Sequence, residues 1–220
     1  MCGLIYFYFV VIFHSAVLIN GETREAVAHL MSEQVNGTIY FTETDNGLRV
    51  HGTITGLSTG RYGFHVHELG DISTCIATGA HFNPYDADHG GRDHTVRHVG
   101  DLGNVQFVGN TALIDFVDNI ITLRGRNNIL GRGLVLHEQE DDLGLGDHET
   151  SLTTGNAGPR IACGVIGIRS PSDWNSGISV NPSVLLLIIV HGLEDICNKI
   201  FPKLFPYIHA INNCNPAFRL

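Results

Sequence analysis

The sequence predicts an all-β domain, built as an antiparallel sandwich or barrel with two long loops. Short runs of alternating or β-branched apolar residues are separated by turn residues about every ten residues, which is typical of such folds. Asp45-Asn46-Gly47 lies between two of these runs and is a strong hairpin signal. Charged residues make up only 16% of the chain and 26 of its 220 residues are Gly, a composition that suits turns and short strands better than helices.

The expected strands follow in order along the chain. Val35 to Phe41 and Leu48 to Ile54 flank the hairpin turn, and Gly63 to His67 also has the pattern of a strand. Further short strands are expected at Asn104 to Val108, Thr111 to Phe116, Ile120 to Leu123 and Gly133 to Leu136. The long loops are Leu69 to Asp101 and His137 to Arg160, and ordered loops of this length are usually functional.

Histidines in and around these loops predict a metal centre. His65 and His67 are two apart on a strand, so both side chains point to the same face. His81, His89, His98 and Asp101 follow in a Gly- and Asp-rich stretch, and His137 comes later. Imidazole-rich sites favour copper and zinc, and a carboxylate in place of one imidazole suits tetrahedral zinc. Spacing alone does not assign each ligand to a metal.

Seven segments together carry a family resemblance. They are GFHVHE at 63–68, GAHFNP at 79–84, HGG at 89–91, RHVGDLGN at 97–104, VLHE at 135–138, DDLG at 141–144 and GNAGPRIACGVIG at 155–167. The residues of these segments, their order and their spacing resemble those of the copper/zinc superoxide dismutases, from about Ala26 to Ile168. The resemblance implies a Greek-key antiparallel fold, and dismutation of superoxide to oxygen and hydrogen peroxide by a redox-cycling copper next to a structural zinc.

The same resemblance implies the role of each site residue. Copper is expected on His65, His67, His81 and His137, and zinc on His81, His89, His98 and Asp101, with His81 shared. Asp141 is expected to orient one copper His and one zinc His. Arg160 is expected to hold the superoxide anion beside the copper, the alternative being a surface ion pair. Cys75 and Cys163 are the family's disulfide pair, and the family also implies a homodimer.

One stretch departs from the family pattern. Leu145, Thr150 and Thr153 stand where we expect a Lys, a Glu and a Lys, although Glu149 remains. In this family such charges attract the anion, an effect for which the family itself is the standard example. We therefore expect the copper chemistry to persist and the encounter rate to be lower. Pro159, where Ser is common, is expected to matter little.

The two ends of the chain lie outside the matched region. Residues 1–21 have the pattern of a secretory signal, apolar from Leu4 to Val11, although without a Lys or Arg at the start; a retained membrane anchor is the alternative. We expect the dismutase domain at 22–170 in a secreted, extracellular protein. In that setting the sequon at Asn36 is a candidate glycosylation site.

The extension at 171–220 has no resemblance to the family. Its apolar run from Val184 to Val190 is too short to span a bilayer, and an amphipathic helix from Ser183 to Ile200 that contacts a membrane or partner is one reading. A disordered extension is the other. Cys197 and Cys214 either pair with each other or stay free.

Charge and motif content exclude other function classes. The formal net charge is −9, and between residues 22 and 171 ten Arg face 19 acidic residues, which argues against a nucleic-acid-binding surface. A dismutase-like metallochaperone usually carries an N-terminal Cys-x-x-Cys module, which the chain lacks. A metal-binding scaffold without turnover is the third reading, and the complete ligand set with Arg160 argues against it.

Overall fold

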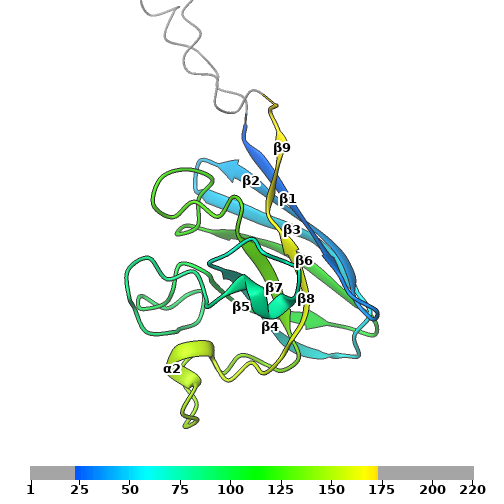
Figure 1. Ribbon diagram of the computed structural model, residues 1–220, viewed down its shortest axis with the longest axis vertical. Coiled ribbons are helices and arrows are strands. Elements are labelled where there is room, and N and C mark those ends of the chain that lie inside the picture. Colours follow the sequence, from blue (N-terminus) through cyan, green and yellow to red (C-terminus); the bar gives the residue numbers. More distant parts are fainter. Residues whose placement is uncertain (1–22, 173–220) are drawn as a thin grey trace, which may run out of the picture. The chain divides into compact units, whose positions relative to one another are not determined.

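Nine strands form the framework of the chain between residues 23 and 172, the part that this computed structural model describes (Figure 1). They are β1 (Glu25–Met31), β2 (Asn36–Thr44), β3 (Gly47–Thr55), β4 (Gly60–His67), β5 (Asp101–Phe107), β6 (Thr111–Asp118), β7 (Gly133–His137), β8 (Arg160–Val165) and β9 (Gly167–Ser170).

The strands form an antiparallel barrel that is nearly closed. Eight of them are hydrogen-bonded in the order β5-β4-β7-β8-β1-β2-β3-β6, and β9 pairs with β1. The chain leaves its sequential order where β3 connects to β4 and where β6 connects to β7, as expected for Greek-key connections. The expected hairpin is confirmed, since β2 and β3 pair from Thr44↔Gly47 to Asn36↔Thr55.

Side-chain burial explains the different strand patterns. In β2, Ile39 and Phe41 are fully buried and alternate with partly exposed neighbours, as in a strand with one face on the core. In β7 all five residues are buried. Both faces of β7 are therefore covered, the inner one by the core and the outer one by the long loops. This second covered face is where histidines can be enclosed.

Two expectations about strands need correction. Ile120 to Leu123 is not a strand, because Oδ1 of Asp118 accepts hydrogen bonds from the backbone N–H groups of Ile120 and Ile121 and turns the chain at the end of β6. Ile121 and Leu123 are each only 1% exposed, so this apolar run anchors a loop in the core. Strand β1 was not expected, because its buried face is formed by Ala26, Ala28 and Leu30, and Ala has a low strand propensity.

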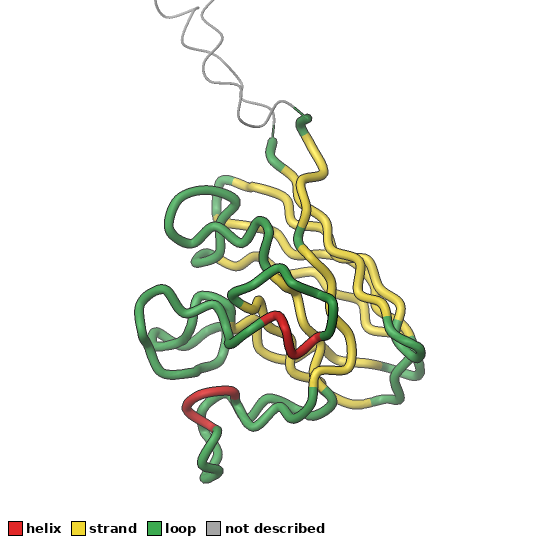
Figure 2. The backbone as a smooth tube through the Cα atoms, viewed as in Figure 1, coloured by secondary structure: helices red, strands yellow, loops and turns green. Residues whose placement is uncertain are grey.

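Both long loops lie beside the barrel and contain one short helix each (Figure 2). The first contains the 3-10 turn η1 (Cys75–Thr78) and the second contains α2 (Ser151–Thr154). Each loop returns to a strand that carries candidate site residues, the first to β5 and the second to β8. The loops therefore connect distant parts of the sequence to one side of the sheet.

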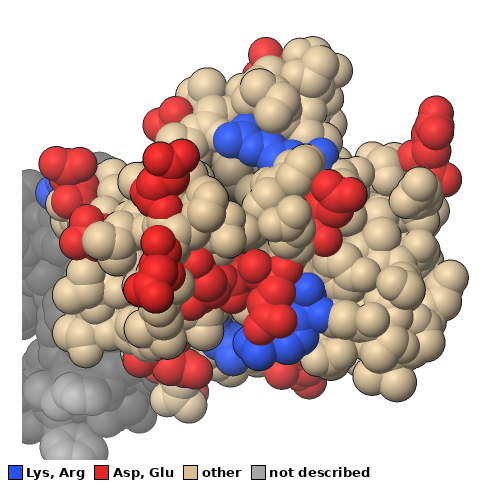
Figure 3. Space-filling view, turned by 90° about the horizontal axis from the view of Figure 1, so that it is seen from below, with Lys and Arg blue, Asp and Glu red and all other residues tan. Residues whose placement is uncertain are grey.

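Several expectations concern residues outside the described range. The signal-like segment 1–21, the helix expected from Ser183 to Ile200, Cys197 and Cys214 all belong there. Among the described residues, no helix has the length and apolar character that crossing a bilayer requires. On the face seen from below, acidic side chains border small groups of basic ones (Figure 3), in keeping with the excess of Asp and Glu in the sequence.

Candidate metal centre

Two groups of buried side chains come together between the barrel and its loops. One consists of His65, His67, His81 and His137, and the other of His81, His89, His98 and Asp101. Within each group one ligand atom from every residue lies within 4.8 Å of the others, and His81 belongs to both. These are the two sets expected from the sequence, now assembled from β4, β5, β7 and the first long loop.

Neighbouring strands supply the first group. His65 and His67 lie on β4, which pairs with β7, so His137 at the end of β7 falls beside them. His81 reaches the same place because it forms an isolated β-bridge with His67. His65, His67 and His137 are at most 3% exposed.

Hydrogen bonds fix which nitrogen of His67 and His137 is free to bind a metal. Nδ1 of His67 lies 2.9 Å from the carbonyl oxygen of Gly79, and Nδ1 of His137 lies 3.0 Å from that of Gly158. A carbonyl only accepts, so Nδ1 carries the proton in both rings and Nε2 keeps a lone pair. The two Nε2 atoms are 3.3 Å apart. Two lone pairs facing each other at this distance repel, and a cation between them removes the repulsion.

Asp141 fixes two further rings. Its Oδ2 lies 2.8 Å from Nε2 of His65, and its Oδ1 lies 2.8 Å from Nε2 of His89. The Nδ1 atoms of His65 and His89 are buried without a hydrogen-bond partner, and so is Nε2 of His81. Buried nitrogens of this kind are costly unless they bind a ligand. The residues therefore fit two metal ions.

The second group surrounds one carboxylate. Oδ1 of Asp101 lies 2.8 Å from Nδ1 of His81 and 3.1 Å from Nδ1 of His98, and Oδ2 lies 3.0 Å from Nδ1 of His89. His89 and Asp101 lie at hydrogen-bond distance, but Nδ1 of His89 is not aligned for a hydrogen bond with the carboxylate. Two side chains that bind the same ion approach each other in this way. The His81 and His98 nitrogens are 3.4 Å apart, which matches the spacing of about 3.4 Å between nitrogens on a tetrahedral zinc.

Burial keeps most of these imidazoles in the neutral form that binds metals. It lowers the pKa of His67, and it lowers the pKa of His81 to about 3 and of His137 to about 2. The positive charge of Arg160 lowers the pKa of His67 and His137 further. His89 differs: burial acts to lower its pKa, but the carboxylates of Asp101 and Asp141 outweigh it and raise the pKa to about 9.

Arg160 lies at the start of β8, opposite His137 in the β7–β8 pairing. Among residues 23–172 it forms no ion pair. Instead its Nη1 is 3.0 Å from three oxygens, the carbonyls of Cys75 and Ile76 and the hydroxyl of Thr78. The side chain is partly exposed. Its guanidinium is therefore available to a small anion.

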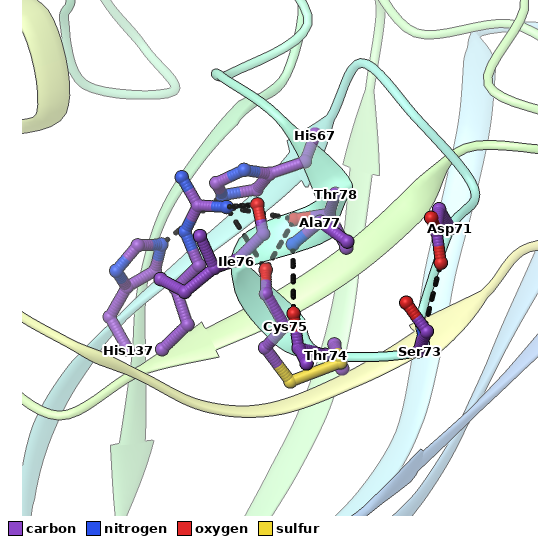
Figure 4. Close-up of a disulfide and its surroundings, with 11 residues drawn as sticks. His67, Asp71, Ser73, Thr74, Cys75, Ile76, Ala77, Thr78 and His137 are labelled. Atoms are coloured by element: carbon purple, nitrogen blue, oxygen red, sulfur yellow. Dashed lines mark hydrogen bonds between the residues drawn. A yellow bond between two sulfur atoms is a disulfide. The ribbon is translucent and has the colours of Figure 1, made fainter.

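A disulfide joins the 3-10 turn to β8. Cys75 and Cys163 are bonded, as the family resemblance implies, and their Cα atoms are 5.6 Å apart across a sequence separation of 88 residues. Figure 4 shows this disulfide next to η1, with Ile76 drawn near the rings of His67 and His137. The bond therefore ties η1 to the strand that carries Arg160.

Two supporting residues were not assigned from the sequence. Arg97 is buried and donates hydrogen bonds to the carbonyl of Asp101 and to the carboxylate of Asp118, the latter at 2.6 Å. The side-chain amide of Asn104 pairs with the backbone of Asp141, with both contacts at 2.8 Å. Arg97 and Asn104 lie within the matched 97–104 segment, but only the folded chain shows that Arg97 supports Asp101 and Asn104 supports Asp141.

Comparisons with known proteins agree with this geometry. The family model for copper/zinc superoxide dismutase (SODC) matches residues 35–166. The extracellular superoxide dismutase [Cu-Zn] of Drosophila melanogaster is 53% identical over 156 residues, covering 66% of this chain and 86% of the relative. Superoxide dismutase [Cu-Zn] 4 of Dictyostelium discoideum is 48% identical over 147 residues, covering 64% of this chain and 97% of the relative.

A solved structure is similar as well. The crystal structure of the clock protein EA4 superposes with a TM-score of 0.65 at 53% sequence identity, covering 66% of this chain and 94% of that one. The chain belongs to the copper/zinc superoxide dismutase family. It is an oxidoreductase that dismutes superoxide, with copper and zinc as its cofactors.

Proposed function

We propose that the protein is a secreted superoxide dismutase in which copper and zinc each bind four side chains and share His81. Copper binds His65, His67, His81 and His137, and zinc binds His81, His89, His98 and Asp101. The observation that carries this assignment is the direction of the free nitrogens: Nδ1 of His81 faces Asp101 and His98, whereas its unpartnered Nε2 remains for the first group. Four imidazoles suit Cu(II), and three imidazoles with one carboxylate suit zinc.

The surrounding side chains orient the ligands and the substrate. Bound copper supplies one-electron oxidation and reduction of superoxide. Asp141 holds His65 and His89 in a fixed tautomer, because it accepts from Nε2 of both rings. Arg160 attracts the superoxide anion and places it beside the first group, with its Nη1 already held by η1. Its Nη2 makes no hydrogen bond with the described residues and is free to donate to the anion.

The proposed location is extracellular. A relative of this chain is named as an extracellular enzyme, and residues 1–21 have the pattern of a signal. We take 22–170 as the dismutase domain and 171–220 as an extension. Asn36 is exposed at the start of β2, so its side chain is accessible to a glycan. Mass spectrometry of the secreted protein, with and without glycosidase, tests both the cleavage and the glycan.

An apolar patch supports a homodimer. Leu69, Ile72 and Val165 are 51%, 43% and 41% exposed, and Leu69 and Ile72 are three residues apart in the sequence. A Cβ atom added to Gly70, between the first two, would lie 3.2 Å from Cγ2 of Val165. Apolar surface of this kind is a common feature of protein interfaces. We propose that two copies of the chain meet through the patch of Leu69, Ile72 and Val165.

The activity is tested on the secreted, metal-loaded protein. Decay of superoxide absorbance is followed by stopped flow, and copper and zinc are measured by elemental analysis of the same sample. We expect fast dismutation with one copper and one zinc per chain. His29→Ala serves as a control, because His29 is an exposed histidine on β1 outside both groups. Full metal loading without dismutation would contradict the proposal and would identify the protein as a metal-binding scaffold without turnover.

A further inference from the structure

The guanidinium of Arg160 is held by one short segment that is distant in sequence. All three acceptors of its Nη1 belong to η1, which lies 82 to 85 residues before it. Nη1 carries two hydrogens, so three oxygens at 3.0 Å must share them. Two of these oxygens are backbone carbonyls. The third, the hydroxyl of Thr78, is the only side chain among them.

The hydroxyl of Thr78 has a fixed direction. Thr78 is 0% exposed, and its Oγ1 donates to the carbonyl of Cys75 at 2.8 Å. With its proton used in this way, the hydroxyl can only accept from Nη1 of Arg160. The methyl group is packed as well, since a Cβ atom added to Gly133 on β7 would lie 2.7 Å from Cγ2 of Thr78. The carbonyl of Thr78 also accepts from the N–H of Leu69 at 2.9 Å.

We propose that Thr78 is a positioning residue for catalysis, because its buried hydroxyl holds Nη1 of Arg160 and leaves the rest of the guanidinium directed at the anion. This inference rests on the proposed role of Arg160. A Thr at this position contributes nothing to metal binding, since no atom of it belongs to either ligand group. Its loss therefore acts on the anion and leaves the metals in place.

The test compares substitutions of Thr78 in the full-length, metal-loaded protein. Thr78→Val removes the hydroxyl and keeps the shape of the side chain. We expect kcat/KM to fall roughly three- to tenfold, the scale of one ordinary hydrogen bond, because Nη1 of Arg160 keeps its two carbonyl acceptors. Copper and zinc content should be unchanged. Azide, a small anion whose binding is followed in the copper absorption spectrum, should bind more weakly by a similar factor. Thr78→Ser, which restores the hydroxyl, should recover most of both losses.

A matched control addresses the stability of η1. Thr74 lies at the start of the same turn, where its hydroxyl accepts from the N–H of Ala77 and does not contact Arg160. Thr74→Val therefore disturbs the turn without removing a contact to the guanidinium. We expect it to leave azide affinity unchanged. If Thr78→Val folds poorly, Thr78→Ala is measured instead, with rates expressed per bound copper.

A double-mutant cycle separates positioning from general destabilisation. If Thr78 acts through Arg160, adding Thr78→Val to Arg160→Met should cost no further activity. An equal loss in both backgrounds, or no loss from Thr78→Val alone, would overturn the inference while leaving the role of Arg160 intact. Full activity of Arg160→Met would overturn the proposed role of Arg160, and the inference with it. The two failures are therefore distinguishable.

Discussion

His81 is the residue on which both ligand groups depend. Its Nδ1 lies 2.8 Å from Asp101 and its Nε2 is buried without a partner. His81→Ala should therefore reduce the content of both metals. His89→Ala should mainly empty the zinc position, since His89 belongs to the second group and not to the first. Elemental analysis after dialysis measures both. Loss of a single metal from His81→Ala would contradict a shared ligand.

Arg160 is expected to act through its charge and its fork of donors. Arg160→Lys keeps the charge and loses the paired donors, so we expect a fall of a few-fold in kcat/KM. Arg160→Glu reverses the charge next to His67 and His137, and we expect a fall of roughly a hundredfold or more. Copper content should be the same in all three proteins. Stopped-flow rates that agree across the three would rule out a role in anion binding.

At the scale of elements, the second long loop can approach the metal centre because a glycine is present. Gly155 has a φ of 65°, and a Cβ atom there would lie 1.9 Å from Oδ1 of Asp141 and 2.5 Å from Nε2 of His89. Gly125 has nearly the same φ, 68°, but no atom within 4 Å of such a Cβ. Substituting Gly155 and Gly125 in parallel therefore separates the cost of backbone strain from the cost of a steric clash.

We expect Gly125→Ala to cost about 1 kcal/mol from its left-handed backbone alone. Gly155→Ala should cost several times more, about 3 kcal/mol or above, and should also lower the zinc content. Urea unfolding of the metal-loaded variants and elemental analysis measure the two effects. Equal destabilisation of both variants would show that the close approach of the new Cβ atom to Asp141 and His89 does not affect stability.

The stretch from Leu143 to Thr154 in this loop lacks the two Lys residues that the family pattern leads us to expect at positions 145 and 153. Leu145 is 74% exposed and Thr153 is exposed on α2. Attraction between exposed charges is screened over about 10 Å at 0.1 M salt. We therefore predict a rate below the diffusion limit with a weak dependence on ionic strength. Leu145→Lys with Thr153→Lys should raise the low-salt rate roughly two- to threefold and steepen its decline with salt.

Stopped-flow measurements over a range of sodium chloride concentrations test this prediction. Leu113→Lys together with Val117→Lys is a matched control, because it adds the same charge to exposed positions of β6, away from the loop. If the unmodified protein already slows sharply as salt is added, other groups such as Arg160 provide the field.

At the scale of the whole molecule, the proposed dimer predicts a change in mass. Val165→Glu places a charge in the patch of Leu69, Ile72 and Val165 and should convert a dimer into a monomer. Val117→Glu on β6 is the control, because Val117 is similarly exposed, at 47%, but lies outside the patch. Sedimentation velocity at micromolar concentration measures the mass. An unmodified protein that sediments as a monomer would remove this proposal.

Much of the strand layout follows from local signals. The hairpin at Asp45-Asn46-Gly47 and the alternating runs around it were predictable, because turn residues and side-chain alternation act over a few residues. The apolar run from Ile120 to Leu123 was misassigned, because its pattern does not distinguish a strand from a buried loop anchor. The decisive contact there comes from Asp118, whose carboxylate binds the backbone N–H groups of the loop.

The sequence by itself determined the family and the set of candidate metal-binding side chains, since motifs and their order can be read along the chain. Only the tertiary structure decided which nitrogen of each imidazole is free, because that depends on partners such as Gly79, Gly158 and Asp141 that are far away in sequence. It also decided what holds Arg160, whose three acceptors all come from η1. Hydrogen bonds act over about 3 Å, so only the fold can establish them between residues separated by tens of positions.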